Sequence, residues 1–169
     1  DLGGYRARIK AAQGRIDGDA TLGPDIHSTY TTLNGKAFAP FQRAVTTAAE
    51  VNAAVDELAA AGAVQIKIHR ALAPEMLPVL LQAAHRRGLA VTGHIPLGVH
   101  PLRACERGMD GIEHVGSFLE AYVSVTPGAT PTTAIDYMLS DAADPLYACL
   151  AARGVAVTPT LVVYPAVAR

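Results

Sequence analysis

The chain has 169 residues, half of them hydrophobic, and a formal net charge of −1 at pH 7. This length and composition favour one domain, residues 1–169, with a sizeable apolar core. The near-neutral charge and the absence of tryptophan give no basis for binding nucleic acid, and no apolar run approaches the ~18 residues that cross a bilayer. We therefore expect neither nucleic acid nor a membrane as a partner.

The first 45 residues carry weak patterns. Residues 1–4 are typical of the end of a strand and its turn. We expect a helix over residues 5–12 and a strand over residues 24–32. No low-complexity linker divides this part from the rest of the chain.

From residue 47 on, Ala- and Leu-rich helical patterns alternate with short β-branched runs. Thr47 and Glu50 form a capping-box pattern at the first of these helices. Glycines and prolines mark the other helix ends. The expected elements are helix 47–62, strand 64–69, helix 74–88, strand 89–94, helix 101–107 and strand 111–115.

The last part of the chain begins with an irregular stretch. Pro127, Gly128 and Pro131 predict a loop there. A helix then begins at Pro145 and ends at Arg153, and residues 155–163 form the last strand. Cys105 and Cys149 show neither a CxxC motif nor a metal-ligand spacing, so we interpret both as buried or incidental thiols. They indicate no cellular compartment.

Strands that alternate with helices indicate βαβ units and a parallel sheet, here with about six strands. A closed (β/α)₈ barrel takes about 250 residues, which is more than this chain has. The sequence therefore favours an α/β fold that is an incomplete (β/α)₈ barrel. An open parallel sheet fits the same pattern.

Three polar side chains lie near the carboxyl ends of successive expected strands, where βα proteins carry their sites. They are Lys67, His94 and His114. Imidazole is a good ligand for zinc and related metals. An ammonium group has no lone pair, so Lys67 could bind a metal only when it is deprotonated or converted by CO₂ to a carbamate. Structural histidines and a strand-end surface lysine are the alternative that spacing alone leaves open.

Other residues near these ends are candidates for substrate binding. His69 shares a strand face with Lys67, and either His69 or Arg70 could meet a substrate carboxylate; the alternative, which the pattern favours slightly, is a solvated strand-end pair. Tyr122, expected in the loop after His114, could donate a hydrogen bond to a carbonyl oxygen. Glu113 points away from His114 if the strand is regular, which favours a packing or supporting role.

Three segments in register carry a specific resemblance. The lysine segment 64–68, the segment 84–96 with Gly93 and His94, and the segment 108–114 that ends at His114 resemble the amidohydrolase superfamily, in particular its imidazolonepropionase-like and prolidase-like members. Segments 1–4 and 157–161 are similar to the second and seventh strands of that family. The resemblance implies one barrel domain that is truncated at both ends and contains about strands two to seven.

The resemblance also implies a metal site. His94 and His114 would be ligands, and Lys67 would be the carboxylated lysine that bridges one or two divalent ions, with zinc expected. The HxH pair of the first strand would precede Asp1, and the catalytic aspartate of the eighth strand would follow Arg169. No catalytic residue is then expected within this fragment, and the chain alone is expected to be inactive.

The implied function is a metal-dependent hydrolase that acts on a C–N bond of a peptide, an acyl-amino acid or a cyclic amide. Its substrate would be a small molecule or a short peptide. An organophosphate or ester hydrolase of the same superfamily and a non-catalytic metabolite-binding barrel are the alternatives. The exposed edges of an incomplete barrel predict self-association into homo-oligomers.

Overall fold

The computed structural model describes residues 1–161 and has the α/β architecture expected from the sequence. Its strands pair in parallel in one six-stranded sheet with the order β2-β1-β3-β4-β5-β6. The strands are β1 (Thr32–Asn34), β2 (Gln42–Ala44), β3 (Gln65–Ile68), β4 (Ala90–Gly93), β5 (Gly111–Glu113) and β6 (Ala156–Thr158).

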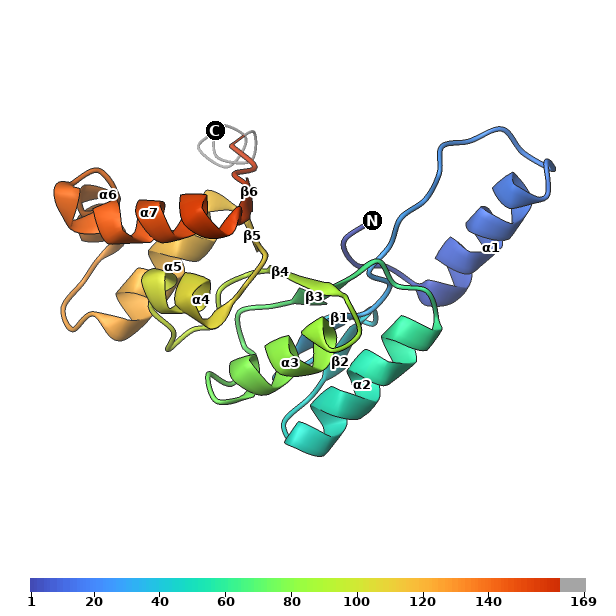
Figure 1. Ribbon diagram of the computed structural model, residues 1–169, viewed down its shortest axis with the longest axis horizontal. Helices are drawn as coiled ribbons and strands as arrows, with labels where there is room; N and C mark the ends of the chain where they lie inside the picture. Colours follow the sequence, from blue (N-terminus) through green and yellow to red (C-terminus); the bar gives the residue numbers. More distant parts are fainter. Residues whose placement is uncertain (162–169) are drawn as a thin grey trace.

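Helices connect most of these strands (Figure 1). They are α1 (Arg6–Asp17), α2 (Ala48–Ala60), α3 (Met76–His85), α4 (Pro101–Arg107), α5 (Val115–Val125), α6 (Pro131–Met138), α7 (Asp144–Arg153) and the short 3₁₀ helix η1 (Asp141–Ala143). Within residues 1–161, none of them is long and apolar enough to cross a membrane.

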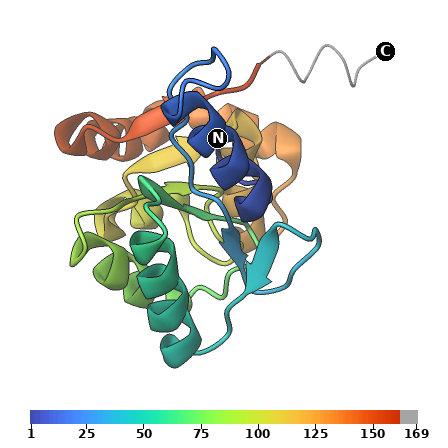
Figure 2. The same cartoon turned by 90° about the vertical axis from the view of Figure 1, so that its right-hand side faces the viewer.

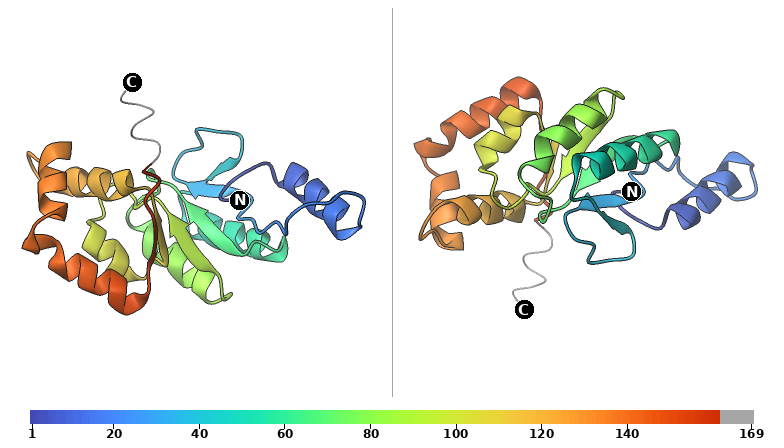
Figure 3. Two further views of the ribbon diagram at one scale, coloured as in Figure 1. Left: turned by 90° about the horizontal axis from the view of Figure 1, so that it is seen from above. Right: turned by 90° about the horizontal axis from the view of Figure 1, so that it is seen from below.

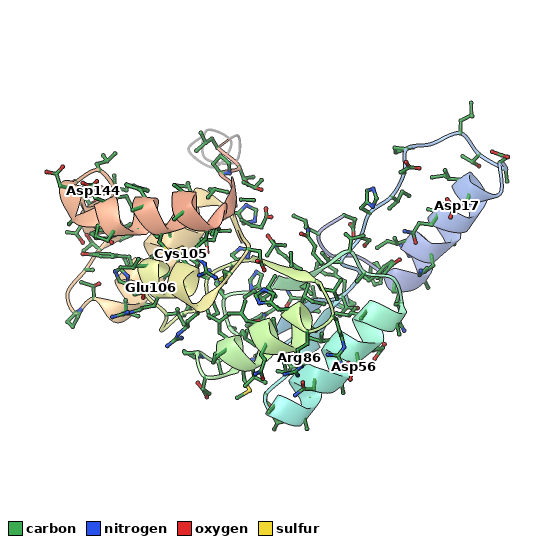
Figure 4. The ribbon with its side chains drawn as sticks, in the orientation of Figure 1. Asp17, Asp56, Arg86, Cys105, Glu106 and Asp144 are labelled. Carbon is green, nitrogen blue, oxygen red and sulfur yellow. A yellow bond between two sulfur atoms is a disulfide. The ribbon has the colours of Figure 1, made fainter. Side chains whose placement is uncertain are left out.

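The two faces of the sheet differ in polarity because successive strand residues point to opposite sides. Ile66, Val91 and Ile112 are fully buried in the apolar core. Helices α2 and α3 lie side by side on this apolar face (Figure 2), and the labelled Asp56 and Arg86 mark them in Figure 4. The opposite face carries polar side chains, including Lys67 and Thr92, which lie side by side in the register of β3 and β4. The polar face is therefore the one on which chemistry is expected.

Several expected helix ends are confirmed. The Thr47 hydroxyl accepts a hydrogen bond from the Glu50 backbone N–H at 3.2 Å, and the Glu50 carboxylate accepts one from the Thr47 N–H at 3.2 Å. This reciprocal pair satisfies backbone donors that the first turn of a helix leaves free. Gly108 and Gly154 end α4 and α7 in the left-handed conformation that glycine adopts without strain.

The predicted elements before residue 45 were largely wrong. Residues 24–31 contain no strand, and two short strands, β1 and β2, follow instead. The expected N-terminal helix is present but longer, and α1 projects from one end of the molecule while α5, α6 and α7 lie at the other (Figure 3). No residue of α1 is buried. A helix that packs on a core carries an apolar stripe, and the bounds of α1 were hard to predict because its sequence has no such stripe.

The predicted loop around Pro127 and Pro131 was also wrong in part. Helix α5 follows β5 directly, and α6 begins at Pro131 behind the N-cap residue Thr130. Proline suits the first turn of a helix because the backbone N–H it lacks has no intrahelical partner there. Only residues 126–130 connect the two helices. The last strand was predicted over residues 155–163, but β6 ends at Thr158, and residues 162–163 lie outside the described part.

The two cysteines form a disulfide, so their interpretation as thiols was wrong. Cys105 on α4 is bonded to Cys149 on α7 across 44 residues of sequence. The labelled Cys105 lies in the region between the two helices in Figure 4. A pairing over this separation has no local sequence signature. The bond fixes α7, whose only buried residue is Leu146, to the rest of the fold.

We predict that the double substitution Cys105→Ser and Cys149→Ser lowers the free energy of unfolding by about 2–4 kcal/mol, because the disulfide restricts the unfolded chain. Urea denaturation with and without a reducing agent measures this effect. Reductant should destabilise the wild-type chain and leave the double variant unchanged. Equal stability of the two proteins under non-reducing conditions would contradict the prediction.

Candidate metal centre

Three histidines directly follow three neighbouring strands. His69 comes after β3, His94 after β4 and His114 after β5, and these strands are adjacent in the sheet. The ring centroids of His69 and His94 are 4.2 Å apart, and those of His94 and His114 are 4.9 Å apart. The structure thus brings His94 and His114 together, as expected, and adds His69 as an immediate neighbour.

Gly93 makes this close approach possible. It has a φ of +140°, and a Cβ built on it would lie 2.1 Å from the backbone oxygen of Ile68. Any side chain at residue 93 would therefore collide with the backbone of β3. The following residue, His94, donates its backbone N–H to the same Ile68 oxygen at 3.2 Å. A glycine before the histidine is thus required for the two strand ends to lie this close.

His114 adopts an unusual backbone conformation. Its φ of +67° is rare for a residue with a side chain, and such strain persists only where surrounding contacts hold it. Two contacts are present: the backbone N–H donates to the Thr158 oxygen at 2.7 Å, and Nδ1 lies 2.7 Å from the Thr160 hydroxyl. The strand is therefore not regular here, and the expected opposition of Glu113 and His114 does not apply. The left-handed turn brings the His114 ring near that of His94.

Lys67 lies in the strand rather than at its end and is 5% exposed. Burial lowers the pKa of its amine, and the nearby Glu113 carboxylate opposes this change. Glu113 is itself 6% exposed and accepts a hydrogen bond from the Thr92 hydroxyl at 3.1 Å. Lys67, Thr92 and Glu113 form a buried polar group on β3, β4 and β5, one or two residues before the histidines.

Burial favours the uncharged form of two of these histidines. The pKa of His94 is lowered to about 3, mainly by burial and in addition by the nearby His69 and Lys67. The pKa of His69 is lowered too, first by burial and then by Arg70 and Lys67. A neutral imidazole has a nitrogen lone pair and can act as a metal ligand. Both rings are thus in the form that binds a cation.

Within the described part of the chain, two ring nitrogens of the site lack a hydrogen-bond partner. Nδ1 of His69 and Nδ1 of His94 are buried and have no hydrogen-bond partner among the described residues. Leaving such an atom unsatisfied costs about 1–3 kcal/mol. The side chains therefore fit a bound cation in their chemistry. In the observed side-chain positions, however, no three His, Cys, Asp or Glu residues within 1–161 converge to hold one ion.

The other two candidate substrate-binding residues, Arg70 and Tyr122, are in contact with side chains of α5 and α6. Arg70 Nη1 donates to both carboxylate oxygens of Glu120 on α5 at 3.0 Å. This pair borders an open cavity of about 470 Å³ that Leu97, Val123 and Ser124 also line. Tyr122 lies in α5 and not in a loop, as was expected; its ring stacks on Tyr137 at 4.3 Å and lies 5.8 Å from His100.

The fold and this site define an α/β protein with uncharged imidazoles and a buried amine at the carboxyl-end side of a parallel sheet. Three solved structures have a similar fold. A. niger ochratoxinase has a TM-score of 0.57 and 18% identity, with 93% of this chain and 50% of that chain covered, and bottromycin amidohydrolase has a TM-score of 0.59 and 23% identity, with 82% and 30% covered. A prolidase in complex with N-methylphosphonate-L-proline has a TM-score of 0.54 and 15% identity, with 87% of this chain and 50% of that chain covered.

These proteins are amidohydrolase-superfamily members, so the resemblance predicted from the sequence motifs is confirmed at the level of the fold. The chain spans half the length of ochratoxinase and 30% of the length of bottromycin amidohydrolase. No protein-family model and no curated protein sequence matches the chain.

We predict a pH dependence of stability from His94 in the chelator-treated protein. Its pKa is about 3 in the folded state against 6.5 for an ordinary histidine. Above pH 6.5 it is neutral in both states. As the pH falls toward 3, the unfolded chain takes up a proton that the folded chain does not, so stability falls by at most about 1.4 kcal/mol per pH unit.

Comparison with His94→Gln isolates this contribution. Denaturation at pH 4, 5, 6 and 7 should show a shallower loss of stability for the variant, because one titrating group is gone. Parallel stability curves for the two proteins would contradict the lowered pKa.

We predict that Gly93→Ala is far more costly than Gly88→Ala. Both glycines have positive φ, but a Cβ at Gly88 meets nothing within 4 Å, whereas one at Gly93 meets backbone atoms of Ile68. Gly88→Ala should cost about 1–2 kcal/mol from backbone strain alone. Gly93→Ala should cost at least about 2 kcal/mol more. Equal unfolding free energies for the two variants would contradict the close approach of β4 to β3.

Proposed function

We propose that the chain is an incomplete (β/α)₈ barrel that contains about strands two to seven. The parallel sheet, the helices on its apolar face and the polar opposite face support this proposal. The share of ochratoxinase that the chain covers, 50%, agrees with a part of a larger barrel. On this proposal the polar face of the sheet is the interior of the barrel.

We propose further that the protein is a metal-dependent amidohydrolase whose divalent-metal centre includes His94, His114 and Lys67, with zinc as the expected ion. The single observation that carries the proposal is the pair of imidazoles of His94 and His114, whose rings lie 4.9 Å apart at the ends of adjacent strands. The unsatisfied Nδ1 of His94 supports it. Zinc, nickel, iron and cobalt all accept such nitrogen ligands.

The chemistry that a bound divalent cation supplies is Lewis acidity, which activates water near neutral pH and polarises the carbonyl group under attack. The residues of this chain would hold the cation, and their contacts fix the orientation of the side chains around it. Because the pKa of His94 is lowered to about 3, its ring is neutral near physiological pH and its lone pair is available there. The contact with Thr160 fixes the orientation of the His114 ring.

Lys67 has two possible states in this site. A lowered pKa increases the fraction of free amine, which is the form that reacts with CO₂ to give a carbamate. The carbamate would place a second negative charge beside Glu113 in a buried region. This is favourable only when a cation lies with them. We therefore propose that carboxylation of Lys67 depends on bound metal.

The proposed substrates are small molecules or short peptides with a C–N bond. The printed names of the structural relatives, an amidohydrolase and a prolidase, support this choice. His69, Arg70 and Tyr122 remain proposed substrate-binding residues. Arg70 would have to leave Glu120 to bind a carboxylate, because its Nη1 now donates to both oxygens of that side chain.

We predict that the protein, expressed with its complete reading frame, hydrolyses at least one member of a panel of Xaa-Pro dipeptides, N-acyl amino acids and cyclic amides. A chelator should abolish the activity and zinc should restore it. The chain of 169 residues alone should show no turnover, since it spans only part of its structural relatives.

Substitutions test which residues are needed. His94→Ala should lower kcat/KM by about 100-fold or more, a loss of about 2.7 kcal/mol of transition-state stabilisation. The control is His85→Ala, because His85 is exposed and its Nε2 lies 2.8 Å from Asp110, and it should leave activity unchanged. Activity that survives metal removal, or turnover only of phosphotriesters or esters added to the panel, would overturn the proposal.

A further inference from the structure

We infer that the Cys105–Cys149 disulfide positions His114, and that it acts through helix α7 and strand β6. The bond joins α4 to α7 and lies outside the proposed metal centre, but the chain runs from Cys149 through α7 and β6 to the contacts that hold His114. The inference rests on the proposed function, because His114 is a residue of the proposed centre. It assigns the disulfide a positioning role beyond its effect on stability.

The backbone and ring of His114 are held by the end of β6 and the two residues after it. The His114 backbone N–H donates to the Thr158 oxygen at 2.7 Å, and Nδ1 lies 2.7 Å from the Thr160 hydroxyl. The next N–H, that of Val115, donates to the Pro159 oxygen at 3.1 Å. A φ of +67° is unfavourable for a histidine unless its surroundings hold it. The place of this short segment therefore decides the conformation of His114.

Strand β6 makes few contacts of its own that could fix this segment. Among the described residues it pairs with β5 alone, and all three of its residues are exposed. Its other connection is to α7 (Figure 1), where the Val155 N–H donates to the Leu150 oxygen at 2.9 Å. A strand with no buried side chain has no apolar burial that opposes its opening. The position of β6 therefore depends on α7.

Helix α7 is itself weakly packed. Its only buried residue is Leu146, and Cys149 follows three residues later on the same face of the helix. The Cys149 sulfur is bonded to that of Cys105, which is fully buried in the core on α4. A covalent bond to a buried residue limits the movement of α7 in the folded chain more than one buried leucine does. The disulfide, α7, β6 and the contacts of His114 therefore form one continuous connection.

A disulfide can also stabilise a protein only by restricting its unfolded chain. In that case its loss lowers the free energy of unfolding but leaves His114 in the folded chain as it is. A disulfide that positions His114 has a further effect, because its loss also changes the surroundings of the His114 ring well below the unfolding transition. The two roles thus differ in a spectroscopic quantity that depends on neither metal nor activity.

The test uses the 169-residue chain, uniformly labelled with ¹⁵N, treated with a chelator and kept where it is folded. Dithiothreitol reduces the bond to two thiols and is itself oxidised to a cyclic disulfide. In the reduced chain and in the double variant Cys105→Ser, Cys149→Ser, the ring ¹⁵N resonances of His114 should shift, because Nδ1 loses its contact with Thr160. Those of His27 should not. The backbone N–H of His114 should exchange with solvent about 10-fold faster or more.

Matched variants separate positioning from a general loss of stability. Leu58→Ala removes a buried side chain of α2 and destabilises the fold while the disulfide stays intact, so the His114 ring resonances should remain those of the wild type. Thr160→Val keeps the disulfide but removes the hydroxyl, so it should shift the same resonances, and Thr160→Ser should restore them. With zinc as the probe, the double variant should bind about 10-fold more weakly than the wild type.

The outcomes separate this inference from the proposed function. Unchanged His114 ring resonances in a folded chain without the disulfide overturn the positioning role, whatever the stability of that chain. A wild-type chain that binds no zinc overturns the proposed centre, and the metal-free spectra still decide the positioning role. If neither the reduced chain nor the double variant folds, the oxidised wild type decides. The N–H groups of His114, Val115 and Val155 should then share one opening free energy, and separate values overturn the inference.

Discussion

Neutral imidazoles buried beside one another need partners for their ring nitrogens, and this requirement governs the site. The sheet supplies the proximity: β3, β4 and β5 are adjacent and parallel, so the residues after them meet at one edge. Gly93 and the left-handed His114 adjust the two strand ends so that the rings come within 5 Å of each other. Burial then lowers the pKa of His94 to about 3, so that its ring is uncharged near neutral pH. Each step follows from the one before it.

The buried polar group below the histidines completes the same arrangement. Lys67, Thr92 and Glu113 lie on the face of the sheet opposite the apolar core, where burial of a lone charge would be costly. An amine beside a carboxylate reduces that cost. Around 320 Å³ of cavity lies next to Thr92 and Glu113 on this face. Ionisable groups near the carboxyl ends of parallel strands lie where βα proteins carry their functional sites.

The sequence predicted the region from residue 47 to residue 114 well because its signals are local. The Thr47 capping box, the glycine stops and the β-branched runs each report on neighbouring residues, and they place Lys67, His94 and His114 correctly on or after their strands. Features that depend on distant contacts were missed. The Cys105–Cys149 bond, the pairing of β1 with β3 and the left-handed conformation of His114 each depend on residues far along the chain. The packing of the His69 ring on His94 is of this kind too.

A crystal structure of the chain soaked with zinc, with anomalous differences measured at the zinc edge, tests the central claim most directly. The account predicts a strong anomalous peak about 2.0–2.1 Å from a ring nitrogen of His94. A ring nitrogen of His114 should lie at the same distance. Histidine rings that keep their present positions, with water at the unsatisfied nitrogens and any zinc bound elsewhere on the surface, would contradict it.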